Sequence, residues 1–362
     1  MANTRLIFVG GFLGAGKTTL LYEITRLLKN RRISVGLITN DQAPDLADTA
    51  LLEQEEINIA EVSGSCFCCD FKALRRAIGK VGKNLKTDVI IAEPVGSCTD
   101  LSATLINPIK EMMNTEVLVS PLTVLADPKR LKEIFGETGS TLHPSAAYII
   151  RKQLEESDII VITKTDLYSR EEINRLKQKL KESFSECEIM AVSSRTGEGV
   201  EEWLNTALTG TNAGRHILDI DYDRYAEGEA VLGWLNCSAS LTGEMVDWDH
   251  FSRELMNSMA GKFDSMNLPV GHVKMMLENG DQYISANLTG NSETLTFRWS
   301  AGTGKSAELI VNARVETSPE MLKDLFLKSL DETTAGKIKV RMNNLRSISP
   351  GYPKPTYRVE KK

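Results

Sequence analysis

The chain has 362 residues, of which 41% are hydrophobic and 25% are charged, and its formal net charge is −6. This composition is typical of a globular protein with roughly two domains, since a domain commonly has about 150 residues. No apolar run is long enough to cross a bilayer and the chain is acidic overall, so we expect no membrane partner, no nucleic-acid partner and a cytoplasmic location.

The first informative segment lies between an apolar strand expected at residues 6–9 and an amphipathic helix that follows it. It carries the pattern G-x-x-x-x-G-K-T from Gly11 to Thr18, which is typical of a phosphate loop. We expect Lys17 to contact the β- and γ-phosphates of a nucleotide and the Thr18 hydroxyl to ligate Mg²⁺. The nucleotide-binding residues expected in this loop are Gly11, Gly14, Ala15, Gly16, Lys17, Thr18 and Thr19.

A second β-rich run covers residues 33–39 and ends at Asn40 and Asp41. Carboxylates that follow the second strand of such a fold are placed to meet Mg²⁺, the attacking water or another metal. Asp41 is therefore a candidate catalytic residue. The alternative is an aspartate that only forms the turn at the end of a strand.

Six cysteines are present, and three of them form a C-x-C-C motif at Cys66, Cys68 and Cys69. Such a cluster is typical of a soft-metal site for Zn²⁺, Co²⁺ or Ni²⁺ rather than of a disulfide framework. The spacing predicts Cys66 and Cys68 on one side of an extended turn, with Cys69 pointing elsewhere or starting the next helix. The alternative is that these thiols are buried small apolar groups.

The next apolar run, residues 89–92, is followed by Glu93, which we expect to serve as the acid of a Walker B-like strand. Gly96 follows three residues later, where its backbone N–H is expected to approach the γ-phosphate. Residues 93–100 are therefore a candidate switch segment. Cys98 lies within it, either as a thiol that moves with the nucleotide state or as a buried residue.

A β-rich run at residues 116–126 precedes another apolar strand, which ends in T-K-x-D at residues 163–166. The Asp166 carboxylate is suited to accept hydrogen bonds from guanine, and the Lys164 stem to cover the base, so the motif selects GTP. Thr163 replaces the usual Asn, which we expect to remove an amide contact to the neighbouring loop. Ser194 lies in a second loop expected to contact guanine.

The order of these elements predicts an α/β domain with a mostly parallel sheet at residues 1–210, covered on both faces. Residues 211–229 are expected to be a linker and residues 230–335 a smaller α+β domain with helices on one face of an antiparallel sheet. Residues 336–362 carry eight Lys or Arg from position 337 onward and one Glu. We interpret them as a basic tail that forms a solvated strap over the acidic body, with a docking device as the alternative.

With phosphate loop, C-x-C-C, E-x-x-G and T-K-x-D in this order, the chain resembles the CobW-type metallochaperone GTPases, relatives of the urease and hydrogenase nickel-insertion GTPases. The resemblance covers about residues 5–210, and the layout of 230–332 is similar to the CobW C-terminal domain. It implies a GTP-dependent switch that controls metal at Cys66, Cys68 and Cys69. It also implies nucleotide-dependent homodimerisation, for which no segment gives independent support.

The leading hypothesis is a GTP-hydrolysing metallochaperone, slow on its own, that uses GTP and Mg²⁺ and delivers Zn²⁺, Co²⁺ or a cobalt corrinoid to a client protein. Its catalytic residues would be Lys17, Asp41 and Glu93. One alternative is a GTP-switched activator that remodels a corrinoid enzyme or metalloenzyme without carrying metal, in which case the cysteines would be structural or redox-active. A small-molecule kinase is a third hypothesis, and it would require preference for ATP.

Overall fold

The computed structural model describes residues 4–41, 47, 58–84, 87–139, 143–291 and 295–361. These residues form two compact units. The first unit contains the described residues within 4–41, 58–228 and 352–361, and the second contains residue 47 and those within 229–351. Among the described residues, no helix combines the length and apolarity needed to cross a bilayer.

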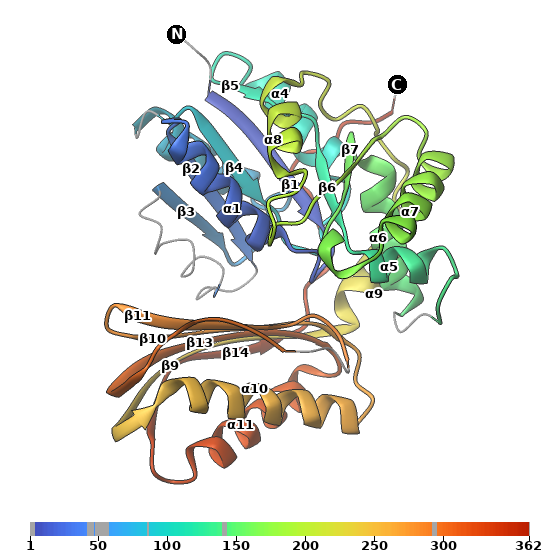
Figure 1. Ribbon diagram of the computed structural model, residues 1–362. Coiled ribbons are helices and arrows are strands. Elements are labelled where there is room, and N and C mark those ends of the chain that lie inside the picture. The colour runs from blue at the N-terminus through green and yellow to red at the C-terminus, as the bar shows by residue number, and fades with distance from the viewer. Residues whose placement is uncertain are drawn as a thin grey trace. The chain divides into compact units, whose positions relative to one another are not determined.

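The first unit is built on an eight-stranded sheet in which every strand pair is parallel (Figure 1). Its strand order is β3-β2-β4-β1-β6-β7-β8, and β5 also pairs with β1. Strands β4, β6 and β7 are buried at every residue, which requires cover on both faces of the sheet. The strands are Thr4–Gly11 (β1), Val35–Asp41 (β2), Asn58–Ser63 (β3), Val89–Glu93 (β4), Val117–Val119 (β5), Thr123–Ala126 (β6), Ile159–Ile162 (β7) and Glu188–Ala191 (β8).

Helices connect these strands, as expected for an α/β domain. Helices α1 and α8 contact each other and β1, and Figure 1 shows them together on one face of the sheet. The α-helices of this unit are Lys17–Asn30 (α1), Phe71–Gly79 (α3), Asn107–Met112 (α4), Pro128–Ile134 (α5), Pro144–Glu156 (α6), Arg170–Ser183 (α7) and Val200–Thr209 (α8). Shorter helical segments are Lys80–Asn84 (η1), Ser102–Ile106 (η2) and Thr165–Leu167 (η3), and Tyr222–Ala230 (α9) lies at the boundary between the two units.

The β-rich run at residues 116–126 forms two short strands rather than one. Pro121 lies between β5 and β6 and has no N–H to donate to a ladder, so a continuous strand is unfavourable there. Strand β5 pairs with the start of β1 and β6 with its end. The break therefore keeps both pieces beside the central strand.

The second unit is a six-stranded antiparallel sheet with the order β12-β11-β10-β13-β9-β14. Helices α10 and α11 pack together and lie on one face of it (Figure 1), which confirms the expected α+β architecture. The strands are Leu232–Asp247 (β9), Val270–Asn279 (β10), Gln282–Leu288 (β11), Thr296–Ser300 (β12), Thr303–Glu316 (β13) and Lys339–Ile348 (β14), and the helices are Trp248–Ser265 (α10) and Pro319–Thr334 (α11).

The segment expected as a basic tail has two different parts. Residues 339–348 form β14, which pairs antiparallel with β9 at the edge of the second sheet. Basic residues alternate there with the apolar residues Val340 and Met342, which is the pattern of a strand. Charged side chains of this kind are common on exposed edge strands. Residues 352–361 belong to the first unit, and we call them the C-terminal strap.

Candidate functional site

The sequence motifs meet at one edge of the parallel sheet. The phosphate loop follows β1, Asp41 ends β2, the cysteine loop follows β3 and Glu93 ends β4. T-K-x-D follows β7. Because these strands are parallel, their carboxyl ends share one edge, which is the usual ligand-binding edge of open α/β sheets.

The phosphate loop requires glycine where it approaches β6. Gly11 has φ +128°, and a Cβ there would lie 2.5 Å from the Leu125 carbonyl oxygen. Lys17 opens α1, and its Nζ donates to the carbonyl oxygens of Gly11 at 2.8 Å and Phe12 at 3.4 Å. The loop thus holds a buried ammonium group beside main-chain atoms that line the expected phosphate site.

The remaining phosphate-loop residues lie in the same turn and at the start of α1. Ala15 donates its N–H to the Phe12 carbonyl at 3.1 Å, which closes the loop. Thr18 is buried and Thr19 is half-buried. Gly14 and Gly16 complete the turn, so the seven residues expected to surround a nucleotide form one continuous segment from the end of β1 to the start of α1. Their contacts with nucleotide remain predictions.

Glu93 and Gly96 both lie against Lys17. A Glu93 carboxylate oxygen is 3.9 Å from Lys17 Nζ, so the two form a buried ion pair. A Cβ on Gly96 would lie 3.1 Å from Lys17 Nζ and 2.7 Å from Leu13 Cδ2. The segment after β4 therefore packs directly on the phosphate loop, and its role as a switch remains a prediction.

Asp41 ends β2, where its backbone pairs in register with Ser63 of β3. Its side chain lies outside the described residues, so its catalytic role remains a prediction. The residue before it has a defined role that the sequence analysis missed. The Asn40 amide donates to the carbonyl oxygens of Val62 and Ser65, both at 2.8 Å, and accepts from the Phe67 N–H at 2.8 Å. Asn40 thus joins the end of β2 to the cysteine loop.

The expected guanine site has an oriented carboxylate. Asp166 accepts a hydrogen bond from the Ser193 hydroxyl at 2.6 Å and pairs with Arg195 at 2.7 Å. Lys164 pairs with Asp127 at 2.6 Å, which fixes its stem beside the same edge. Ser194 is half-buried next to Ser193, and its contact with guanine remains a prediction. The orienting role of Ser193 was not predicted from the sequence.

Thr163 does contact the neighbouring loop, contrary to the expectation drawn from the missing Asn. Its hydroxyl donates to the carbonyl oxygen of Ala15 in the phosphate loop at 2.9 Å. A threonine hydroxyl has a donor that can replace one amide N–H at this position. The guanine motif and the phosphate loop therefore remain connected.

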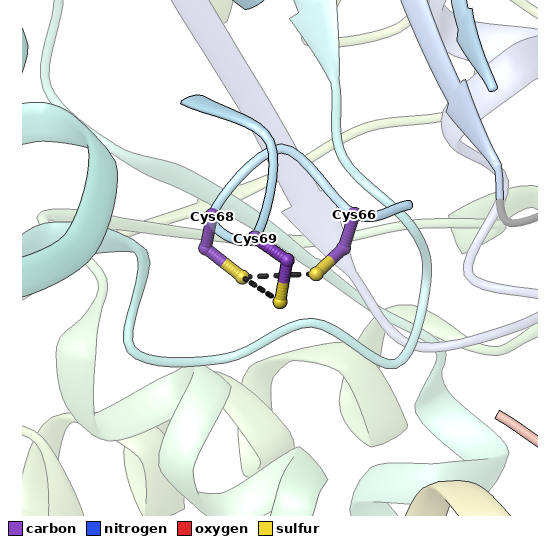
Figure 2. A group of neighbouring side chains, drawn as sticks. All are labelled: Cys66, Cys68 and Cys69. Carbon is purple, nitrogen blue, oxygen red and sulfur yellow. Dashed lines mark hydrogen bonds between the residues drawn. The ribbon is translucent and has the colours of Figure 1, made fainter. Parts of the chain in front are cut away.

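The three thiols of the C-x-C-C motif converge (Figure 2). The sulfur atoms of Cys66, Cys68 and Cys69 all lie within 4.8 Å of one another. Cys66 Sγ is 3.0 Å from Cys68 Sγ, which is 3.9 Å from Cys69 Sγ. The expectation that Cys69 points elsewhere was wrong.

The backbone of the cysteine loop explains this convergence. The N–H groups of Cys69 and Asp70 both donate to the Cys66 carbonyl at 3.0 Å, so the segment curls instead of extending. Asp70 then caps α3 by accepting from the Ala73 N–H at 2.9 Å. The helix begins at Phe71, which leaves all three cysteines in the preceding turn.

The cluster favours one ionised thiol. Hydrogen bonds from Cys68 and then from Cys69 lower the pKa of Cys66. The same contact with Cys66 raises the pKa of Cys68 and raises that of Cys69 to about 11. An incoming metal ion must displace the protons of the thiols whose pKa is raised.

The C-terminal strap lies on the cysteine loop. The Lys354 N–H donates to Cys69 Sγ at 3.2 Å, and the Thr356 N–H donates to the Cys68 carbonyl at 2.8 Å. The Tyr357 ring packs edge-on against Phe71, with the ring centroids 5.1 Å apart. These contacts hold the strap against the cysteine loop, whereas residues 339–348 of the same predicted tail form β14.

The strap also pairs with a buried acid in the segment after β4. Arg358 Nε donates to Asp100 Oδ2 at 2.8 Å, and the Tyr222 hydroxyl donates to the same oxygen at 2.7 Å. Burial raises the pKa of Asp100, while these two donors oppose that rise. Burial also raises the pKa of nearby Glu156, to about 8. Pairings between residues so distant in the sequence have no local signal, so they were not predicted.

Comparisons with known proteins agree with this geometry. A model of the CobW/HypB/UreG nucleotide-binding domain matches residues 5–191. The zinc-regulated GTPase metalloprotein activator 1 of Dictyostelium discoideum is 26% identical over 237 residues, which cover 55% of this chain and 48% of that relative. The zinc chaperone CobW of Pseudomonas aeruginosa is 24% identical over 206 residues, which cover 50% of this chain and 54% of that relative. The matches thus span about half the length of these relatives.

Among solved structures, the Zn(II)-bound YjiA GTPase from E. coli aligns with 91% of this chain and 99% of its own, at 15% identity and a TM-score of 0.37. This score is too low to support a functional comparison. The family model covers more than half of the sequence and includes the phosphate loop, the cysteine loop, Glu93 and T-K-x-D. The chain therefore belongs to the CobW/HypB/UreG family, with that family's nucleotide-binding domain at residues 5–191.

Proposed function

We propose that this protein is a GTP-hydrolysing metallochaperone that binds a soft divalent metal at Cys66, Cys68 and Cys69 and delivers it to a client protein. One observation carries the proposal: three converging thiols lie at the same sheet edge as the phosphate loop. Family membership supports the nucleotide part of the proposal, and the names of the zinc-chaperone relatives support the metal part.

GTP is the nucleotide that the site favours. Asp166 is held by Ser193 and Arg195 at the end of β7, and its two oxygens can accept hydrogen bonds that guanine donates and adenine lacks. Thr18 and Glu93 supply the hard oxygen donors that suit Mg²⁺, which would neutralise phosphate charge when bound. Lys17 supplies a further positive charge to the phosphates, and Asp41 is the residue proposed to orient the attacking water.

Zinc is the metal that we favour, with Co²⁺ as the second choice. Thiolates are soft ligands that select Zn²⁺ and related ions over Mg²⁺ or Ca²⁺. Three thiolates from one loop leave the fourth tetrahedral position to another group. A metal held in this way can pass to a client by exchange of one ligand at a time.

The nucleotide would control that exchange. Glu93 and Gly96 contact the phosphate-loop lysine, and Asn40 connects the end of β2 to the cysteine loop. Binding of GTP at Lys17 would therefore order segments that adjoin the thiols, and hydrolysis would relax them. The client would be a metalloprotein or a corrinoid protein, and a second copy of the chain bound with nucleotide would be a further partner.

The test is zinc binding by the purified full chain, measured by competition with a chromophoric chelator. One zinc ion per chain should bind tightly, and Cys66→Ser should weaken binding by at least about tenfold. Cys187→Ser is the matched control, because Cys187 lies outside the cluster and should leave binding unchanged. If no zinc or cobalt binds, or if Cys66→Ser binds like the wild type, the carrier function fails and an activator without metal becomes the better hypothesis.

A further inference from the structure

A fourth thiol contacts the cysteine cluster from a different element. Cys98 lies in the segment after β4 and is 2% exposed. Its side chain interacts with the thiols of both Cys66 and Cys68, while its sulfur lies outside the group of three motif sulfurs that are all within 4.8 Å of one another. The contact is independent of the C-x-C-C motif, because Cys98 lies 29 positions after Cys69 in the sequence.

The backbone around Cys98 is well fixed. The Cys98 N–H donates to the Val95 carbonyl at 2.9 Å, which makes a tight turn. The buried Gln153 amide donates to the carbonyl oxygens of Gly96 at 3.0 Å and Cys98 at 2.8 Å. These bonds from α6 hold the thiol in position, so its approach to the cluster is a built contact rather than the chance position of a loop.

We propose that Cys98 is the fourth ligand of the metal bound by Cys66, Cys68 and Cys69, which makes the site a tetrathiolate. The inference rests on the proposed function, since it adds a ligand to the same metal. Four cysteine sulfurs around Zn²⁺ are an established tetrahedral set. Three come from the turn after β3, and the fourth comes from the segment after β4, two strands away in the sheet.

A tetrathiolate zinc centre carries a net charge of about −2, since each thiolate contributes −1 and zinc +2. Such a centre needs donors close to the sulfurs. The strap provides one, because the Lys354 N–H points at Cys69 Sγ at 3.2 Å. Arg358 adds a cation that is paired with Asp100, two residues after Cys98.

Cys98 also gives the metal a direct connection to the nucleotide. Gly96, two residues earlier, packs against Leu13 and the Lys17 ammonium, so the same short segment touches the phosphate loop and the thiols. When Lys17 turns from the Gly11 carbonyl to a phosphate, this segment must adjust. The number of thiolates on the metal then depends on the nucleotide, with four in the nucleotide-free and GTP-bound states and three in the GDP-bound state.

The test is X-ray absorption spectroscopy of the zinc-loaded full chain, first without nucleotide. The wild type should show four sulfur neighbours at about 2.3 Å, and Cys98→Ser should show three together with one oxygen or nitrogen at about 2.0–2.1 Å. Zinc affinity of Cys98→Ser should fall by at least about tenfold. Cys237→Ser is the matched control, because this cysteine is equally buried but lies in the second unit.

The two hypotheses fail in different ways. If Cys66→Ser loses zinc but Cys98→Ser keeps the wild-type sulfur count and affinity, the fourth-ligand assignment is wrong and the carrier function stands. If Cys66→Ser changes nothing, the carrier function itself is wrong. Should Cys98→Ser fail to fold, the wild-type spectrum decides, since three sulfurs and one lighter atom would overturn the assignment.

Discussion

The substitution Gly96→Ala isolates the contact between the segment after β4 and the phosphate loop. Gly96 does not have a positive φ, so alanine meets no backbone strain there. The added methyl carbon would instead lie 2.7 Å from Leu13 Cδ2, 3.1 Å from Lys17 Nζ and 3.3 Å from the Leu13 backbone nitrogen. Leu13 is buried, so its side chain has little room to yield.

Overpacking of this kind typically costs about 1–3 kcal/mol. Because the crowded groups are the lysine and main chain that cradle phosphate, most of this cost should appear in nucleotide binding. An energy of 1.4 kcal/mol corresponds to tenfold in affinity, so we expect GDP and a non-hydrolysable GTP analogue to bind about 5- to 150-fold more weakly.

Isothermal titration calorimetry measures these affinities, and thermal unfolding without nucleotide measures the stability of the variant. Gly79→Ala is the matched control, because a Cβ at this position in α3 meets nothing within 4 Å. It should bind nucleotide like the wild type. Wild-type affinity of Gly96→Ala for both nucleotides would refute the proposed contact between the switch segment and Lys17.

Three further predictions concern other parts of the site. Asp166→Asn removes one carboxylate oxygen acceptor and should weaken binding of GTP by about 10- to 100-fold, measured by calorimetry. Glu156→Gln should abolish a pH-dependent loss of stability. Because the pKa of Glu156 is raised to about 8, the folded protein keeps a proton that the unfolded chain releases above about pH 4.5. The free energy of unfolding of the wild type should therefore fall by up to about 1.4 kcal/mol per pH unit between these two values. Arg358→Ala leaves the buried Asp100 without its cation and should lower the free energy of unfolding in urea by about 1–3 kcal/mol.

A defined experimental result would contradict each of these predictions. If the Asp166→Asn variant binds GTP as tightly as the wild type, Asp166 has no role in guanine recognition. A wild-type protein equally stable at pH 5 and pH 8 would show that Glu156 does not hold a proton at neutral pH. Lys361→Ala, in the exposed end of the strap, should be neutral, so equal effects of the two strap variants would contradict a role for the Arg358 and Asp100 pair.

Much of the fold and nucleotide site could be predicted because their signals are local. Phosphate binding requires glycines and a lysine at fixed spacing, as between Gly11 and Thr18, and buried parallel strands are continuous apolar runs, as at Val89–Glu93. The cysteine cluster was visible for the same reason. The turn that adds Cys69 to it was not, because the main-chain bonds to Cys66 depend on how the loop curls.

The contacts that connect the motifs have no such signal. Asn40 reaches the cysteine loop, Cys98 reaches Cys66, and Arg358 reaches Asp100 from the other end of the chain. Each of these pairs is brought together by the sheet and the strap rather than by sequence spacing.

The most direct test of the account compares zinc affinity in two nucleotide states. The full chain is titrated with zinc in the presence of Mg²⁺ and either a non-hydrolysable GTP analogue or GDP. We predict one zinc ion bound tightly with the GTP analogue, weaker binding with GDP, and loss of that difference in Cys98→Ser. Because binding linkage is reciprocal, zinc should tighten binding of the GTP analogue relative to GDP by the same factor. Equal zinc affinity in both nucleotide states would contradict a nucleotide-controlled metal site.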